Sequence, residues 1–361
     1  MRSFSLAGLA AAIVAILAGC AGSGGSGLTP SSGTSSTNRV MGANHRVDLS
    51  QTLVVPHSVR PNLHRVINNE PFVKPNCCAL QKTVFISDAF GGSLFTGAID
   101  MFDYVKGTFL GQVAAPPEGF SEVQGGCADN NGNVYFTNTA MSTIDEYNHG
   151  GTYIATLADP GQYPVGCSYD RTTGNLAVSN IISTSGGPGS IAIYNGGTLQ
   201  NTYSVPNMFR AYFLAYEGNT GVLWLDGASS SGVFVLETFF DGVFTIVPIT
   251  GATIGFPGGL AWSAKTRLMN LGDQNTFSAP TIYEINDAGV VKGEVVLQCT
   301  QQSDICDPVD FAIKGPGLVA PDSVGLDAAR FAYPAGGPPI LEYTPPSGYI
   351  QPIGAAISSN K

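Results

Sequence analysis

Residues 164–180 read Pro164-Val165-Gly166-Cys167-Ser168-Tyr169-Asp170, a short connector, then Gly174-Asn175-Leu176-Ala177-Val178-Ser179-Asn180. Versions of this phrase return along the chain every 42–50 residues. A chain that repeats itself at such a period forms a ring or stack of small sheets, because one unit cannot bury both of its faces alone. The repeat therefore predicts an architecture before it says anything about a ligand.

The first part of the repeat is a short apolar strand, often opened by proline with glycine or aspartate two residues later. Strands crowded around a common axis favour an apolar residue followed by a small one. Such pairs begin at seven positions: Cys78, Cys127, Cys167, Leu214, Leu260, Phe311 and Ala355.

The second part is a β-branched and aromatic run that ends in Asp or Asn, and it occurs six times. A third, alternating run such as Ile144–Tyr147 leads through a glycine-rich turn to a fourth. Four short strands repeated six times predict an all-β protein, a six-bladed β-propeller of four-stranded blades over residues 77–361. The seventh copy of the first part, Pro352–Ser358, either closes the ring against N-terminal sequence or belongs to a seventh blade completed by residues 39–74.

The phrase resembles the repeat of the NHL, gluconolactonase and virginiamycin B lyase-like group of six-bladed β-propellers, over roughly residues 75–358. Residues 126–138 and 164–180 carry most of that motif. The group includes binding modules and enzymes, so the resemblance implies the fold and leaves the function open. The lyase-like members hold a metal and a histidine base in later blades, whereas the last histidine here is His149. The Glu-Gly-Pro ligand phrase of the gluconolactonases has a poor counterpart in Pro117–Phe120.

The N-terminus predicts an exported protein. Residues 1–19 combine one positive charge with a short apolar core, as a secretory signal peptide does. Leu17–Cys20 resembles the bacterial lipobox, which implies cleavage before Cys20 and a lipid on its sulfur; the alternative is an ordinary signal peptide with a chance cysteine. Residues 20–38 are rich in glycine and serine and predict a flexible tether. We expect a membrane-anchored lipoprotein on the outer membrane or cell surface of a bacterium.

Charge is divided unevenly along the chain. Residues 39–76 form a basic arm of net charge +3, whereas residues 77–361 carry a net charge of −14. An acidic head repels phosphate backbones, so nucleic acid is not an expected partner. The arm either folds back onto the acidic propeller or packs on the ring without a function.

Six cysteines remain after Cys20, an even number that fits disulfides in an exported chain. Cys299 and Cys306 flank a polar loop, and we expect them to pair. The other four lie early in the predicted ring, three of them at one repeat position: Cys77, Cys78, Cys127 and Cys167. Either two of those three neighbours join near the axis and Cys77 pairs with the third, or cysteine fills a tight site as a small apolar residue.

The Asp and Asn residues that end the second strands are candidate metal ligands: Asp88, Asn138, Asn180, Asp226, Asp273 and Asp322. In the resembled group, these strand ends lie on one face around the channel mouth. Converging carboxylate and amide oxygens suit a hard cation such as calcium. The alternative is that each side chain caps its own turn.

Loops between blades on the same predicted face carry aromatic residues, which form a candidate binding face for a protein or glycan: Phe120, Tyr163, Phe209, Phe256 and Tyr349. The alternative is that these rings pack between adjacent blades. Nucleophilic catalysis needs a histidine near the nucleophile, and in the predicted ring the sequence offers His149 alone. We therefore expect a lipid-anchored, non-enzymatic binding module without a cofactor; the alternative is a metal-dependent lactonase or lyase of the gluconolactonase-like type.

Overall fold

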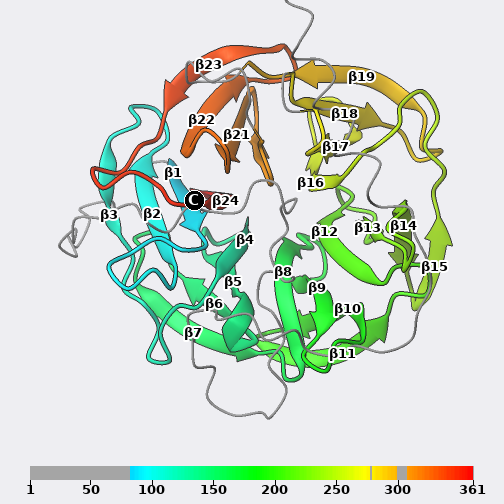
Figure 1. The fold of residues 1–361 in the computed structure, drawn as a ribbon, viewed down its shortest axis with the longest axis horizontal. Coiled ribbons are helices and arrows are strands. Elements are labelled where there is room, and N and C mark those ends of the chain that lie inside the picture. Colours follow the sequence, from blue (N-terminus) through cyan, green and yellow to red (C-terminus); the bar gives the residue numbers. More distant parts are fainter. Residues whose placement is uncertain (1–81, 277–278, 299–306, 361) are drawn as a thin grey trace, which may run out of the picture. The chain divides into compact units, whose positions relative to one another are not determined.

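The computed structural model describes residues 82–276, 279–298 and 307–360. These residues form six four-stranded antiparallel sheets arranged as the blades of a propeller (Figure 1). Apart from the 3₁₀ turn η4 (Thr139–Met141), the regular structure in these ranges consists of strands. No helix in the described ranges is long and apolar enough to cross a membrane. The prediction of an all-β, six-bladed propeller is confirmed.

Each blade of the first half runs from the axis outwards in a regular order. Blade 1 contains β24 (Pro352–Ser359), β1 (Lys82–Asp88), β2 (Ala98–Asp103) and β3 (Phe109–Gln112). Blade 2 contains β4 (Val123–Ala128), β5 (Val134–Asn138), β6 (Thr143–Tyr147) and β7 (Tyr153–Ala158). Blade 3 contains β8 (Gln162–Tyr169), β9 (Asn175–Ser183), β10 (Pro188–Asn195) and β11 (Thr198–Ser204).

The second half follows the same order. Blade 4 contains β12 (Arg210–Tyr216), β13 (Leu223–Ala228), β14 (Phe234–Phe240) and β15 (Val243–Ile246). Blade 5 contains β16 (Pro257–Ser263), β17 (Leu268–Asp273), β18 (Thr281–Ile285) and β19 (Val291–Val296). Blade 6 contains β20 (Ala312–Lys314), β21 (Gly317–Asp322), β22 (Asp327–Ala332) and β23 (Gly336–Glu342).

The C-terminal strand closes the ring. β24 pairs antiparallel with β1, so that Val84 lies opposite Ile357 and Phe85 opposite Ala356. The seventh copy of the first-strand phrase is therefore the innermost strand of blade 1, and the described residues contain six sheets. The ring-closing interpretation of Pro352–Ser358 is confirmed. Residues 39–74 and the copy of the phrase at Cys78 lie outside the described residues.

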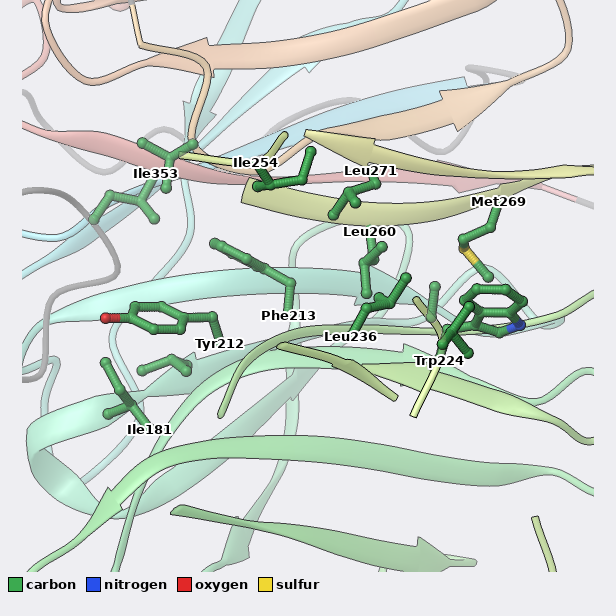
Figure 2. Close-up of a cluster of buried hydrophobic side chains, with 14 of the residues drawn as sticks. Ile181, Tyr212, Phe213, Trp224, Leu236, Ile254, Leu260, Met269, Leu271 and Ile353 are labelled. Carbon is green, nitrogen blue, oxygen red and sulfur yellow. The ribbon is translucent and has the colours of Figure 1, made fainter. Parts of the chain in front are cut away.

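Apolar faces of neighbouring blades pack against each other. Between blades 4 and 5, Trp224 and Leu236 belong to one cluster with Leu260, Met269 and Leu271 (Figure 2). These five side chains are at most 5% exposed. Burying a large apolar side chain contributes on the order of 2 kcal/mol. Contacts of this kind make each blade depend on its neighbours, as the repeat period predicts.

The same cluster crosses the propeller axis. It includes Ile353 of β24, Val165 of β8, Tyr212 and Phe213 of β12, and Val309 just before β20. Figure 2 shows the Phe213 ring on the side of its strand that faces Ile353. Since these residues come from four different blades, they can meet only near the axis. The channel is therefore filled by apolar side chains near the start of the inner strands.

Candidate functional site

A cavity of about 880 Å³ lies where the inner strands end; we call it the channel cavity. Its walls come from the inner strands of all six blades: residues 126–128, 166–169, 213–216, 260–263, 310–313 and 355–357. The turns between the first and second strands of blades 3 to 6 extend these walls. A volume of this size lies in the range of about 300–1,000 Å³ that is usual for ligand pockets.

The inner strands approach closely because most copies of the phrase carry glycine at the third position. A Cβ atom on Gly259 would lie 2.7 Å from the Oδ1 atom of Asp310, which leaves no room for a side chain. Two blades depart from glycine at this position, blade 4 with Phe213 and blade 6 with Asp310. Both residues line the channel cavity. They form its floor above the apolar axis cluster.

The Asp310 carboxyl is the buried acid of this floor. Its Oδ1 atom accepts a hydrogen bond of 2.8 Å from the Phe311 N–H. Burial raises the pKa of Asp310 to about 7, although the N–H groups of Phe311 and Gly126 favour the charged form. Gly126 belongs to blade 2, so the carboxyl lies close to the axis. Near neutral pH it can donate or accept a hydrogen bond.

A second carboxyl, Asp226, lies near the first but is not among the residues that line the cavity. Its Oδ1 atom accepts a 2.8 Å hydrogen bond from the Phe213 N–H. Complete burial, and to a smaller degree the charge of Asp310, raise the pKa of Asp226 well above its usual range. Asp310, and not Asp226, is therefore the acid that faces the cavity.

Basic side chains gather around the cavity mouth, and we call four of them the rim cations: Arg171, Lys265, Arg267 and Lys314. The rim also carries Glu217 and Asp287. Glu217 accepts a 3.1 Å hydrogen bond from the indole N–H of Trp224. Lys265 donates a 3.1 Å hydrogen bond to the Tyr333 carbonyl. The pKa of Lys314 is lowered by burial and then by repulsion from Arg171 and Lys82.

Three aromatic side chains line one side of the cavity, and we call them the aromatic wall: Tyr169, Tyr216 and Trp262. They hold equivalent positions near the ends of β8, β12 and β16, in three consecutive blades. All three are partly exposed. Tyr169 also stacks on Tyr135, with ring centroids 6.4 Å apart. Flat, partly exposed rings of this kind can support the apolar face of a ligand.

A disulfide joins the walls of blades 2 and 3. Cys127 and Cys167 are bonded, with Cα atoms 5.6 Å apart, and both residues line the channel cavity. This confirms the interpretation in which two cysteines at the same repeat position join near the axis. Cys20, Cys77, Cys78, Cys299 and Cys306 lie outside the described residues, so the lipid and the other pairings stay predictions.

The predicted ring of Asp and Asn residues lies at the opposite end of the inner strands. Four of its members bind N–H groups of the loop that enters their own blade. Asp88 accepts hydrogen bonds from Ile350 and Gln351, of 2.7 and 2.8 Å. The other three pairs are Asn138 with Ser121, Asp273 with Gly255 and Phe256, and Asp322 with Asp307.

The remaining two members are bound inside their own blades. Asp226 accepts the hydrogen bond from Phe213 described above, and the Asn180 amide donates to Ser190 Oγ at 3.1 Å. Within the described ranges, no group of three or more His, Cys, Asp or Glu residues is placed to hold a metal ion. The geometry thus supports the turn-capping alternative, and calcium binding by this ring stays a prediction.

The five aromatic residues of the predicted binding face are not prominently exposed. Phe120, Tyr163 and Tyr349 are buried, and Phe209 and Phe256 are partly exposed. Phe256 packs edge-on against Tyr212, with ring centroids 5.4 Å apart. Three of the five rings are therefore not exposed as predicted, because each of them packs in a buried hydrophobic cluster.

His149 holds a structural position in the turn between β6 and β7. Its Nδ1 atom lies 2.7 Å from Ser358 Oγ, and its Nε2 atom lies 3.4 Å from Thr83 Oγ1. Ser358 in turn donates a short hydrogen bond to the Gly132 carbonyl. The histidine is buried, so this Ser–His contact ties β24 and β1 to blade 2 and offers no accessible nucleophile.

Comparisons with known proteins identify the fold. No family model and no curated protein matches the chain. A chain in the crystal structure of a nidogen–laminin complex superposes with a TM-score of 0.60 at 15% sequence identity, covering 78% of this chain and 99% of that one. In all, 1092 solved chains match. A fold shared so widely does not select one activity.

Proposed function

We propose that this chain is an exported, lipid-anchored β-propeller that binds a ligand in the channel cavity without converting it. The cavity carries this proposal: it is lined by inner-strand residues of all six blades, closed by a floor and open at a rim rich in charge. The repeat phrase supports placing the chain beside the NHL and gluconolactonase-like propellers. The lipobox-like Leu17–Cys20 and the tether of residues 20–38 support display on the outer membrane or cell surface of a bacterium.

The metal-dependent lactonase or lyase alternative receives less support from the geometry. Its ligands would come from the ring of Asp and Asn residues, and four of those side chains already bind the loops that enter their own blades. A hard cation would have to compete with these N–H groups.

A thermal-shift screen of glycans, peptides and small metabolites tests the binding role. We expect at least one compound to raise the melting temperature of the wild type. Asn219→Trp, on an exposed turn that lines the cavity, should abolish that shift while leaving the melting temperature of the free protein unchanged. Mass spectrometry should recover the compound intact. A chemically altered compound, or a shift that Asn219→Trp leaves unchanged, would contradict the proposal.

Expression in a bacterium fed an alkyne fatty acid tests the anchor. The wild type should carry the label and sediment with membranes, whereas Cys20→Ser should be unlabelled. A wild-type protein that is unlabelled and soluble would overturn the anchoring part of the proposal.

A further inference from the structure

We propose, building on the binding function above, that the channel cavity recognises an acidic oligosaccharide. Its sugar rings would lie against the aromatic wall, its carboxylates would meet the rim cations, and one of its hydroxyls would reach Asp310. Each of these three parts has its own support in the structure.

The first support is the concentration of positive charge. The described residues contain nine Lys and Arg side chains, and four of them are the rim cations, which outnumber the two acids of the same rim, Glu217 and Asp287. They gather in a region, residues 77–361, of net charge −14. The charges that act on half-buried Lys314 are those of Arg171 and Lys82, both cationic. An anion placed between such groups relieves their repulsion and forms charge-assisted hydrogen bonds.

The second support is backbone strain at one rim cation. Arg267 has φ +59, in the left-handed region. The corresponding turn positions of blades 2, 3 and 4 are Gly132, Gly174 and Gly221, with φ of +86, +78 and +76. This conformation is sterically unfavourable for a residue that has a Cβ atom. An arginine retained where the other blades use glycine points to a role for its side chain.

The third support is the pairing of wall and floor. Partly exposed rings on one side and a hydrogen-bonding carboxyl below suit a ligand that is apolar on its faces and hydroxylated at its edges. A hydroxyl can donate to ionised Asp310 or accept from its protonated form, whereas an inorganic anion would be repelled by the charged state. The volume of about 880 Å³ suits a short oligosaccharide or a chain end.

Calorimetric titration with uronate trisaccharides tests this inference. The probes are trigalacturonate, trimannuronate and a glucuronate-containing trisaccharide, each beside its neutral methyl ester. We expect at least one acid to bind and its ester to bind at least about tenfold more weakly. Added NaCl should weaken the binding of the acid. Arg171→Ala and Arg267→Ala should each lower the affinity for the acid by about tenfold or more. Lys292 is exposed and lies outside the cavity, so Lys292→Ala removes the same charge and should leave the affinity for the acid unchanged.

Three results would overturn the inference. These are equal affinity for an acid and its ester, equal losses in Arg171→Ala and Lys292→Ala, and no binding of any acid. Melting temperatures of the variants confirm that each is folded. The thermal-shift screen separates the two proposals: a peptide or neutral compound whose binding Asn219→Trp abolishes would sustain the binding function and reject the acidic oligosaccharide.

Discussion

Arg267 occupies the left-handed backbone position that Gly174 occupies two blades earlier, with φ values of +59 and +78. Both residues stand in the turn between the first and second strands of their blades. Glycine adopts this conformation without steric cost, whereas arginine does not. The strained backbone of Arg267 therefore lowers the stability of the fold, and the side chain of this residue lies at the rim of the channel cavity.

Arg267→Gly should relieve this strain while weakening the cavity's hold on anions. We expect an unfolding free energy that is unchanged or raised by up to about 1 kcal/mol, because the added chain entropy of glycine offsets part of the relief. Urea denaturation measures this effect. Leu326→Gly is the matched control, since Leu326 has φ +58 and does not line the cavity. A loss of stability in Arg267→Gly would show that its side chain serves packing instead.

Breaking the Cys127–Cys167 disulfide should destabilise the propeller. The two cysteines are separated by 40 residues, and a loop of that length corresponds to about 4 kcal/mol in the chain-entropy model, with measured values commonly about 2–4 kcal/mol. The double variant Cys127→Ser/Cys167→Ser should lose this amount in urea denaturation. Adding dithiothreitol should lower the unfolding free energy of the wild type towards that of the variant. Equal stability of the two oxidised proteins would contradict the bond's role.

Asp310 should make the propeller less stable as pH rises. Its pKa is about 7 in the folded chain, against 3.8 for the ordinary group. Between these values the unfolded chain releases the proton first, so stability falls by about 1.4 kcal/mol per pH unit and levels off above pH 7. Asp310→Asn should remove this contribution, which reaches on the order of 4 kcal/mol at pH 8.

Denaturation of both proteins at pH 5, 6, 7 and 8 measures the contribution of Asp310. Asp145 and Asp159, with pKa values raised by burial to about 7 and about 6, give both proteins a slope of the same sign. The difference between the two curves is therefore the quantity to compare. Parallel curves for the wild type and Asp310→Asn would reject the buried-acid interpretation.

The repeat phrase predicted the blades because each strand type carries its own local pattern. The sequence left two alternatives for ring closure, because local sequence does not reveal a pairing partner about 270 residues away. The structure pairs β24 with β1 and places Ile357 opposite Val84. The Cys127–Cys167 pair was also open, because an inner-strand site favours a small apolar side chain whether or not a bond forms. The sequence evidence for this pairing was that both cysteines hold the same position in consecutive repeats.

The channel cavity was not predicted, because the binding face was assigned to the opposite end of the inner strands. Position in a loop does not say whether an aromatic ring is exposed, and Tyr349 is fully buried. Two signals were nevertheless present in the sequence. Asp310 replaces the glycine of the inner-strand phrase, and Arg267 replaces the glycine of the following turn. Each of these residues departs from the repeat, and each lines the channel cavity in the structure.

Asp88→Ala distinguishes turn capping from metal binding in the ring of Asp and Asn residues. Asp88 accepts hydrogen bonds from Phe90, Ile350 and Gln351, and the last two hold the loop that leads into the ring-closing strand. Leaving these N–H groups unpaired should cost at least about 2 kcal/mol of unfolding free energy. The loss should be the same with calcium or with a chelator, and exposed Glu342→Ala should show none. A chelator that lowers the wild type to the stability of Asp88→Ala would instead show that a metal ion, and not the loop, is the partner of this carboxylate.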